Sequence, residues 1–326
     1  MLIIEKGLKR LVNLRGDLVM STRHGFNPNE KAKIIERFGN DFYEKVLRDF
    51  DVYAEMWNLT SLQFIPSYSA NIVFVCQSAN FGDAVLKIGN PSSREIRTEF
   101  NTLRQYNGRR FCKVFAADLE NGVILEARVQ PGTPLREENS LESRAAVFCS
   151  LYKYLHEAPE NEAIYPTYIE WVERITAYMS KRIDCQELYR HMSRAKEICL
   201  SIASKYSEKM LLHGDFHHDN ILLGPGNAYV IIDPKGVIGD PVFDIPRFIL
   251  NEFDDEITPE LEQKINDLIC ILGENLDIPS GILKQCLYVE TVMGMCWMVE
   301  DGAPPEQYPQ LMKQVAFVEA LMGIEE

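Results

Sequence analysis

Two short stretches decide the fold and the chemistry that we predict for this chain: His213-Gly214-Asp215-Phe216-His217-His218-Asp219-Asn220 and, after it, Ile231-Ile232-Asp233-Pro234-Lys235-Gly236. Phosphoryl transfer needs a carboxylate that accepts the proton of the attacking hydroxyl, and an amide and a second carboxylate that hold Mg²⁺. Magnesium takes oxygen ligands, usually one or two carboxylates with phosphate and water. We therefore predict Asp215 as the base, and Asn220 and Asp233 as metal ligands.

The spacing Asp-x-x-x-x-Asn matches the catalytic loop of protein kinases, with Gly214 in place of their Arg. At His-His-x-Asn and at Asp-Pro-Lys-Gly the chain resembles the aminoglycoside phosphotransferase family, and most of all its streptomycin 6-kinase and hydroxyurea kinase branch. The resemblance covers about residues 40–305. It implies a kinase that uses ATP and Mg²⁺ and transfers the γ-phosphate in line to a hydroxyl of a small molecule.

The composition fits a globular chain of 326 residues with 46% hydrophobic residues. No apolar run approaches the roughly 18 residues that a membrane helix needs. The N-terminal ten residues lack the apolar core of a signal peptide. Eight scattered cysteines without a Cys-x-x-Cys pair indicate reduced thiols. We expect a cytoplasmic protein with no membrane partner.

The formal net charge is −14, and no basic patch stands out. A nucleic-acid partner is therefore not expected. An acidic surface raises the local concentration of cationic substrates, but it also serves solubility alone, so charge does not select a substrate. The sequence does not indicate an oligomeric state.

The first part of the chain predicts helices and then strands. Residues 1–60 are mostly helical in pattern, with apolar residues at helical spacing in Lys31–Phe38 and Phe42–Val52. Strands are expected at Asn71–Cys76 and Ala84–Ile88, which form a hairpin, and at Phe111–Ala117 and Gly122–Ala127. A helix begins near Pro91 and carries Ile96, Phe100 and Leu103 on one face.

Helical patterns follow the break at Pro131-Gly132. Thr258-Pro259-Glu260 marks one helix start, with a capping Thr, Pro at the first position and then an acid. The other helices are expected in Leu141–His156, Glu170–Met179, Leu188–Tyr206, Leu283–Glu300 and Tyr308–Met322. Strands first and helices afterwards predict an α+β protein, a two-lobed protein-kinase-like fold. Its antiparallel-sheet N-lobe, residues 1–128, would bind nucleotide, and its helical C-lobe, residues 129–326, would carry the catalytic loop and the substrate pocket.

A kinase also needs a cation for the nucleotide phosphates on a strand, and an acid on the next helix to hold that cation. Ala84-Val85-Leu86-Lys87 supplies Lys87. Glu99 lies twelve residues later, and Glu99…Leu103 matches the Glu-x-x-x-Leu pattern of the resembling family. Glu95, one turn earlier, is the rival.

Other nucleotide contacts are predicted from position. Ser67–Asn71 lies where the resembling family turns over the nucleotide, and Ser69 and Asn71 are its candidate residues, although an ordinary surface turn fits equally. Residues 125–135 resemble the family's hinge, where backbone groups bond to adenine. The hinge candidates are Glu126, Ala127, Arg128 and Val129.

Several residues near the motif have supporting or open roles. His213 resembles the histidine that orients the family's catalytic loop, and Asp244 matches an acid that braces it. His217 and His218 fit structural roles better than catalytic ones. Lys235 is characteristic of the branch, and both a phosphate contact and a substrate contact remain open for it.

The substrate pocket is expected in the C-terminal half, since carboxylates there would bind a cationic aminoglycoside. A charge run also fits a solvated face, and methionines at helical spacing fit a core. The substrate candidates, besides Lys235, are Glu252, Asp254, Asp255, Trp297, Glu300 and Asp301.

Three alternatives to an antibiotic kinase remain. A metabolite kinase for a sugar, amino alcohol or amino acid would use the same catalytic set. A non-catalytic nucleotide-binding protein would keep the scaffold without turnover. A zinc hydrolase would gather His213, His217, His218 and Asp219 around a metal, but it leaves Lys87, Glu99 and Asp233 unexplained.

Overall fold

The computed structural model describes residues 26–66, 70–254 and 256–323. The chain divides into two compact units, Met1–Gln130 and Pro131–Glu326, which we call the first and the second unit and describe separately. The division falls between Gln130 and Pro131, two residues after the lobe boundary between residues 128 and 129 that the sequence predicts. No helix among the described residues has the length and apolar character needed to cross a membrane.

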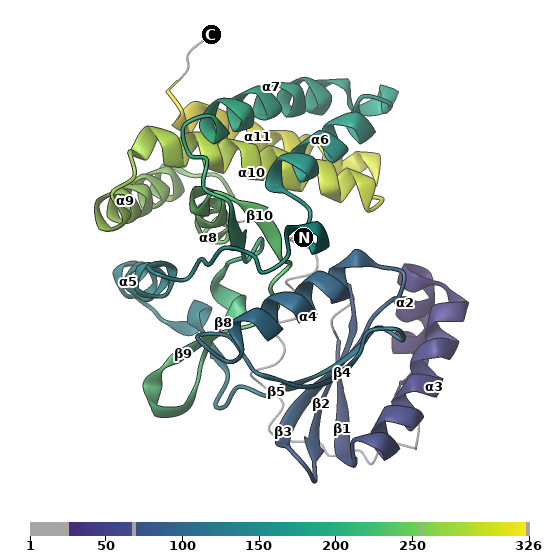
Figure 1. The fold of residues 1–326 in the computed structure, drawn as a ribbon. Coiled ribbons are helices and arrows are strands. Elements are labelled where there is room, and N and C mark those ends of the chain that lie inside the picture. Colours follow the sequence, from purple (N-terminus) through teal and green to yellow (C-terminus); the bar gives the residue numbers. More distant parts are fainter. Residues whose placement is uncertain (1–25, 67–69, 255, 324–326) are drawn as a thin grey trace. The chain divides into compact units, whose positions relative to one another are not determined.

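The first unit is built on one five-stranded antiparallel sheet with the order β1-β2-β3-β5-β4 (Figure 1). Its strands are β1 (Leu59–Ile65), β2 (Ile72–Ser78), β3 (Gly82–Ile88), β4 (Val114–Asp118) and β5 (Val123–Ala127). Its helices are α2 (Pro28–Phe38), α3 (Asn40–Met56) and α4 (Arg94–Tyr106). The predicted hairpin is present as β2 and β3, whereas β1 was not predicted.

The two faces of this sheet have different partners. One face joins α2 and α3 in a hydrophobic core that includes Phe74, Leu86 and Leu125. Because side chains alternate along a strand, Lys87 on β3 and Glu126 on β5 lie on the opposite face. In the pairing of β3 with β5, Lys87 is opposite Ile124, so Glu126 is its diagonal neighbour. Long side chains reach one another at such positions.

The second unit is mostly helical. Its helices are α5 (Leu141–Tyr152), α6 (Tyr168–Met179), α7 (Gln186–Ala203), α8 (Ile245–Leu250), α9 (Pro259–Leu276), α10 (Ser280–Glu300) and α11 (Tyr308–Leu321). The helix α10 is buried along most of its length and contacts α6, α7, α8, α9 and α11. At the start of α9, Thr258 accepts a hydrogen bond from the backbone N–H of Leu261 and Pro259 is the first helical residue, as the sequence predicts.

Short strands complete the second unit and were not predicted as pairs, because each has only two or three residues. One antiparallel group has the order β6-β8-β9, and a second pairs β10 with β7. Their bounds are β6 (Thr133–Pro134), β7 (Met210–Leu212), β8 (Ile221–Leu223), β9 (Tyr229–Ile231) and β10 (Val237–Gly239). An antiparallel sheet in one unit and a helical majority in the other make the α+β class that the sequence predicts.

Candidate active site

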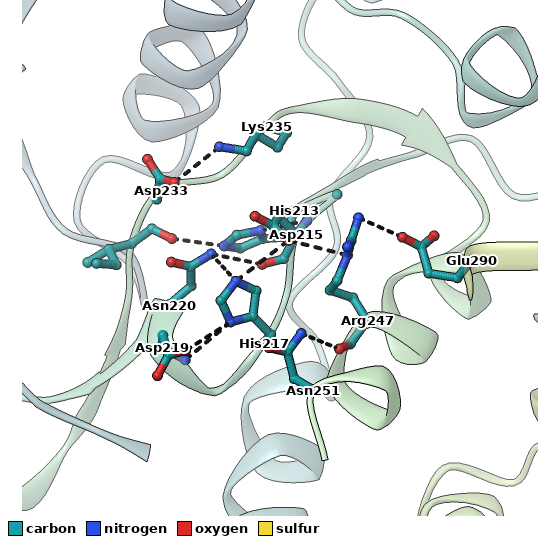
Figure 2. A network of polar contacts seen from close by, with 12 residues as sticks. His213, Asp215, His217, Asp219, Asn220, Asp233, Lys235, Arg247, Asn251 and Glu290 are labelled. Carbon is teal, nitrogen blue, oxygen red and sulfur yellow. Dashed lines mark hydrogen bonds and ion pairs between the residues drawn. The ribbon is translucent and has the colours of Figure 1, made fainter. Parts of the chain in front are cut away.

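The two motif stretches lie side by side in the second unit. The strand β7 leads into the loop from His213 to Asn220, whose last three residues form a 3₁₀ turn. Ile221 pairs with Ile231 in the β8–β9 hairpin, and the Ile232 N–H donates to the main-chain oxygen of Asn220 at 3.0 Å. This pairing brings Asp233 next to Asn220, and Figure 2 shows both near Asp215.

His213 fixes the course of the loop. Its Nδ1 accepts a hydrogen bond from the Asp215 N–H at 3.1 Å, and its Nε2 lies 2.9 Å from the Ile232 carbonyl oxygen. The tautomer that suits both contacts carries its proton on Nε2 and donates it to Ile232. Burial lowers the pKa of His213, which favours this neutral form. The ring therefore supports the predicted orienting role and not proton transfer.

Asp244 anchors the same loop from the far side. Its carboxylate accepts hydrogen bonds from the backbone N–H of His213 at 2.8 Å and of Gly214 at 2.7 Å. His156 Nε2 lies 2.9 Å from the same carboxylate. Burial alone raises a carboxyl pKa, but these contacts hold the pKa of Asp244 below its usual value. An ionised, fully satisfied carboxylate thus braces the loop, the role that the sequence suggests for it.

Gly214 is required by local geometry. Its φ of +77° lies in the left-handed region, and a Cβ there would meet Trp171 Cη2 at 2.9 Å and Val237 Cγ1 at 3.0 Å. A larger residue is strained by both effects. The Arg that protein kinases carry at this position does not fit this backbone beside Trp171.

Asp215 lies between the side chains of Arg247 and His217. Its Oδ1 is 3.3 Å from Arg247 Nε and 3.6 Å from His217 Nε2. Oδ1 is buried and has no hydrogen-bond partner among the described residues, while the side chain as a whole is 17% exposed. Burial raises the pKa of Asp215, but the interactions with His217 and Arg247 outweigh it and hold that pKa below its usual value. Asp215 is therefore ionised, with Oδ1 facing the Arg247 guanidinium.

The side-chain amide nitrogen of Asn220 donates a hydrogen bond within the loop itself. Nδ2 donates to the main-chain oxygen of Asp215 at 2.9 Å and lies 3.3 Å from His217 Nε2. The amide oxygen is then the atom of Asn220 that remains for a ligand. Oxygen is the donor type that Mg²⁺ takes, so the residue fits the predicted metal role.

Asp233 has left-handed backbone, with φ of +57°, at the end of the β8–β9 hairpin. Lys235 Nζ lies 3.1 Å from its Oδ2, and both side chains are about one third exposed. An Asn220 amide oxygen and an Asp233 carboxylate are hard oxygen donors, and such a set suits Mg²⁺ bound together with phosphate oxygens and water. The Lys235 ammonium is placed to neutralise the same carboxylate.

The first unit holds the predicted Lys87–Glu99 pair. The two side chains form a buried ion pair, and Asn71 Nδ2 donates to Glu99 Oε2 at 3.3 Å. Glu99 is buried and lies one turn after Ile96 on the inner face of α4, whereas Glu95 in the first turn is exposed. The structure thus pairs Lys87 with Glu99. Asn71, predicted as a nucleotide contact, supports that pair.

Glu126 has a contact that its predicted hinge role does not explain. Its Oε2 lies 3.3 Å from Lys87 Nζ, and its Oε1 is buried without a hydrogen-bond partner among the described residues. Among the predicted hinge residues, the N–H groups of Ala127 and Arg128 donate to the main-chain oxygens of Lys113 and Asp83, at 2.7 Å and 3.1 Å. These two donors are therefore engaged within the first unit. Ser69, the other predicted nucleotide residue, lies outside the described residues.

The predicted substrate acids differ in their surroundings. Glu252 is buried and paired with Arg144, His218 and Lys264, at 2.6, 2.8 and 3.1 Å. These contacts favour a structural role for it, and burial lowers the pKa of His218 to about 4. Glu300 receives a two-pronged contact from Arg174, at 2.6 and 2.9 Å. Asp254 and Asp301 are exposed, and Asp255 lies outside the described residues.

A chain of contacts leads from Asp215 through Arg247 to Trp297 and, through Glu290, to Tyr168. Of these residues the sequence predicts Asp215 and Trp297 alone. The ring of Trp297 packs edge-on against Trp171 at 5.8 Å, and the Arg247 guanidinium is 5.9 Å from its centre. Arg247 NH2 is 2.7 Å from Glu290 Oε1, and Glu290 Oε2 accepts a 2.6 Å hydrogen bond from the Tyr168 hydroxyl. A lone Arg in a short helix gives no sequence signal, and only the fold brings these residues together.

The histidines do not form the zinc cluster considered as an alternative. Within the described part of the chain, no group of three or more His, Cys, Asp or Glu is arranged to hold a metal ion. His213 and His218 are instead committed to Ile232 and Glu252, and Asp219 accepts a two-pronged contact from Arg136, at 2.9 and 2.8 Å. All eight cysteines are free thiols, and seven are buried.

Comparison with known proteins adds to this geometry. The family model described as aminoglycoside/hydroxyurea antibiotic resistance kinase matches residues 57–302. Streptomycin 6-kinase of Streptomyces griseus is 23% identical over 255 residues, which are 76% of this chain and 81% of that protein. Hydroxyurea phosphotransferase of Kitasatospora aureofaciens is 25% identical over 312 residues, 91% and 86% of the two chains.

A solved structure supports the fold. The crystal structure of a thermostable mutant of aminoglycoside phosphotransferase APH(4)-Ia, a ternary complex with ADP and hygromycin B, aligns with a TM-score of 0.59. The sequence identity is 12%, and the alignment covers 84% of this chain and 97% of that chain. The predicted protein-kinase-like α+β fold is thereby confirmed.

Proposed function

We propose that this chain, which belongs to the aminoglycoside/hydroxyurea antibiotic resistance kinase family, transfers the γ-phosphate of ATP to a hydroxyl of a streptomycin-like aminoglycoside or of hydroxyurea. The family assignment makes it a phosphotransferase. Two relatives named for these acceptors, streptomycin 6-kinase and hydroxyurea phosphotransferase, support the substrate class. We propose, beyond this assignment, that the chain uses ATP and Mg²⁺, that its acceptor is one of these two kinds of molecule, and that its residues have the roles described below.

The ionised, fixed and partly exposed carboxylate of Asp215 is the observation that supports the proposal most strongly. It is ionised, its loop is fixed through His213 and Asp244, and its carboxylate keeps some exposure. Such a group accepts a hydrogen bond from an incoming hydroxyl and later its proton. A low pKa is sufficient, because transfer passes through a loose transition state in which positioning and charge matter more than base strength.

The other residues supply charge and position. Lys87, held by Glu99, would neutralise the nucleotide phosphates, and this is the arrangement that kinases use. Asn220 and Asp233 would hold Mg²⁺, which supplies positive charge at the phosphates when bound. Lys235 would neutralise the Asp233 carboxylate or contact the acceptor. Backbone groups of residues 126–129 that are not engaged within the first unit would contact adenine.

The acceptor side is proposed in the second unit. Trp297, together with the exposed Asp254 and Asp301 and with Glu300, would contact the substrate. Carboxylates attract a cationic aminoglycoside, while hydroxyurea, which is uncharged, would use mainly shape and hydrogen bonds. The net charge of −14 is compatible with a cationic acceptor, does not select one, and disfavours nucleic acid. Free cysteines support a reducing compartment, and we propose the cytoplasm.

A panel of acceptors tests the substrate. ATP consumption with Mg²⁺ would be measured with streptomycin, other aminoglycosides, hydroxyurea, small sugars and amino alcohols, with the Asp215→Ala variant as the blank. We expect turnover that depends on streptomycin or hydroxyurea. Turnover on a sugar or amino alcohol alone would keep the chemistry and replace the resistance role by a metabolic one. ATP binding without turnover on any acceptor would favour the non-catalytic alternative.

A further inference from the structure

We propose that Arg247 is a positioning residue for phosphoryl transfer, which holds the carboxylate of Asp215 while Glu290 and Trp297 fix its own guanidinium. The inference rests on the proposed role of Asp215 as the base. It concerns α8 and α10, which contribute no residue of the two motif stretches. Figure 2 shows Arg247 between Asp215 and Glu290.

Arg247 is almost fully buried, with 4% exposure. Burying a guanidinium is costly unless charge and hydrogen-bonding partners replace water. Glu290 supplies such a partner through the 2.7 Å contact from NH2 to Oε1. Glu290 is itself 3% exposed and is held by the Tyr168 hydroxyl. The guanidinium therefore has a fixed anchor on the side away from Asp215.

The contact with Asp215 differs from the contact with Glu290. Nε lies 3.3 Å from Oδ1, and the geometry does not satisfy a hydrogen bond, so charge holds the Asp215 carboxylate there. A tight two-pronged hydrogen bond to Asp215 would compete with the substrate hydroxyl for the carboxylate. A cation at this distance orients the carboxylate, and it leaves the carboxylate oxygens able to accept a hydrogen bond from the substrate hydroxyl.

The geometry explains why arginine suits this position. Its planar fork presents separate nitrogens to two acids, and its face lies over the ring of Trp297 at 5.9 Å. A lysine ammonium is a point charge on a flexible stem and does not reproduce this three-way contact. Arg247 also links the base to Trp297, the residue proposed to contact the acceptor.

The test compares Arg247→Met and Arg247→Lys with a matched control. Arg194 also pairs with a carboxylate, Glu319, and lies over an aromatic ring of α10, Tyr288 at 5.6 Å, but it has no contact with the motif. For each variant, kcat, the KM of both substrates, ATP affinity and thermal stability are measured. We expect Arg247→Met to lower kcat about 100-fold, the scale for a misplaced catalytic group, with ATP affinity unchanged.

Arg247→Lys should recover part of the lost kcat, because it restores the charge without the fork, and Arg194→Met should keep the wild-type kcat. Glu290→Gln, which keeps the shape of the anchor, should give a smaller loss than Arg247→Met. It also serves as the second test if Arg247→Met does not fold. The inference is overturned if Arg247→Met or Glu290→Gln folds and retains wild-type kcat while Asp215→Asn is inactive. If Asp215→Asn itself stays active, the proposed function fails first.

Discussion

The carboxylate of Asp244 accepts a 2.7 Å hydrogen bond from the backbone N–H of Gly214, the residue directly before the proposed base. The same carboxylate accepts a second hydrogen bond from the His213 N–H at 2.8 Å. The side chain of Asp244 thus holds a loop that lies 30 residues earlier in the sequence. The position of the base therefore depends on a charge that lies outside the catalytic loop.

Asp244→Asn should destabilise the protein by about 1–3 kcal/mol at pH 7, because an amide N–H would face a backbone N–H that the carboxylate now satisfies. The folded pKa of Asp244 is lowered, so its stabilisation is complete above the unfolded pKa of about 3.9 and is lost as the pH falls through the folded pKa. Urea unfolding between pH 7 and pH 3 measures this. The free energy of unfolding of the wild type should exceed that of the variant by a constant amount from pH 7 to 5. This difference should become smaller below about pH 4. An equal difference at every pH would contradict the assignment.

Gly214→Ala tests the close approach of Trp171. Gly226 is the matched control, because it also has positive φ, +66°, but nothing lies within 4 Å of the position of its Cβ. Gly226→Ala should cost about 1–2 kcal/mol, the penalty of left-handed backbone for a residue with a Cβ. Gly214→Ala should cost more and should also lower kcat, because the Trp171 and Val237 contacts displace the loop. If Gly214→Ala and Gly226→Ala lost the same stability and had the same activity, the close approach of Trp171 and Val237 to Gly214 would have no effect.

Lys87→Met should weaken ATP binding and leave the acceptor KM unchanged. Loss of a hydrogen bond to a charged group costs roughly 1.5–3 kcal/mol, which corresponds to about 10- to 100-fold in Kd. Isothermal titration calorimetry with ATP measures the change directly. Lys113→Met, a change at an exposed lysine of the first unit, is the control. Wild-type ATP affinity in Lys87→Met would remove Lys87 from the nucleotide site.

Asp233→Asn should raise the Mg²⁺ concentration needed for half-maximal activity, because a metal carboxylate is replaced by a neutral amide. Asp277 is the matched control, since it is also an Asp with φ of +57°, and it ends α9 away from the motif. Asn tolerates this backbone, so neither change should disturb the fold. Activity would be titrated with Mg²⁺ after treatment with a chelator. Identical titrations for both variants would contradict the metal role.

Local patterns predicted the parts of the site that follow one another along the chain. The Asp-x-x-x-x-Asn spacing identified the loop, and the β2–β3 alternation placed Lys87 on a strand. The Glu-x-x-x-Leu pattern of the resembling family favoured Glu99 over Glu95, and the structure buries Glu99 with Ile96 and Leu103. Each of these inferences depends on residues that are close together in the sequence.

Residues that depend on contacts across the fold were not predictable in the same way. Arg247 meets Asp215 across 32 positions and Glu290 across 43, and no local pattern encodes either contact. The side chain of Glu126 was missed for another reason. It was assigned to the hinge by position along the chain, whereas the register of β3 with β5 turns it toward Lys87. Glu252, in an acidic run, is buried beside Arg144.

The role of Asp215 as the base is tested most directly by comparing the wild-type protein with Asp215→Asn for transfer of labelled γ-phosphate to streptomycin and to hydroxyurea. ATP affinity is measured on the same samples. We expect a phosphorylated acceptor with the wild type, none with Asp215→Asn, and equal ATP affinity in both. Phosphorylated acceptor at the wild-type rate from Asp215→Asn would contradict the assignment of Asp215 as the base.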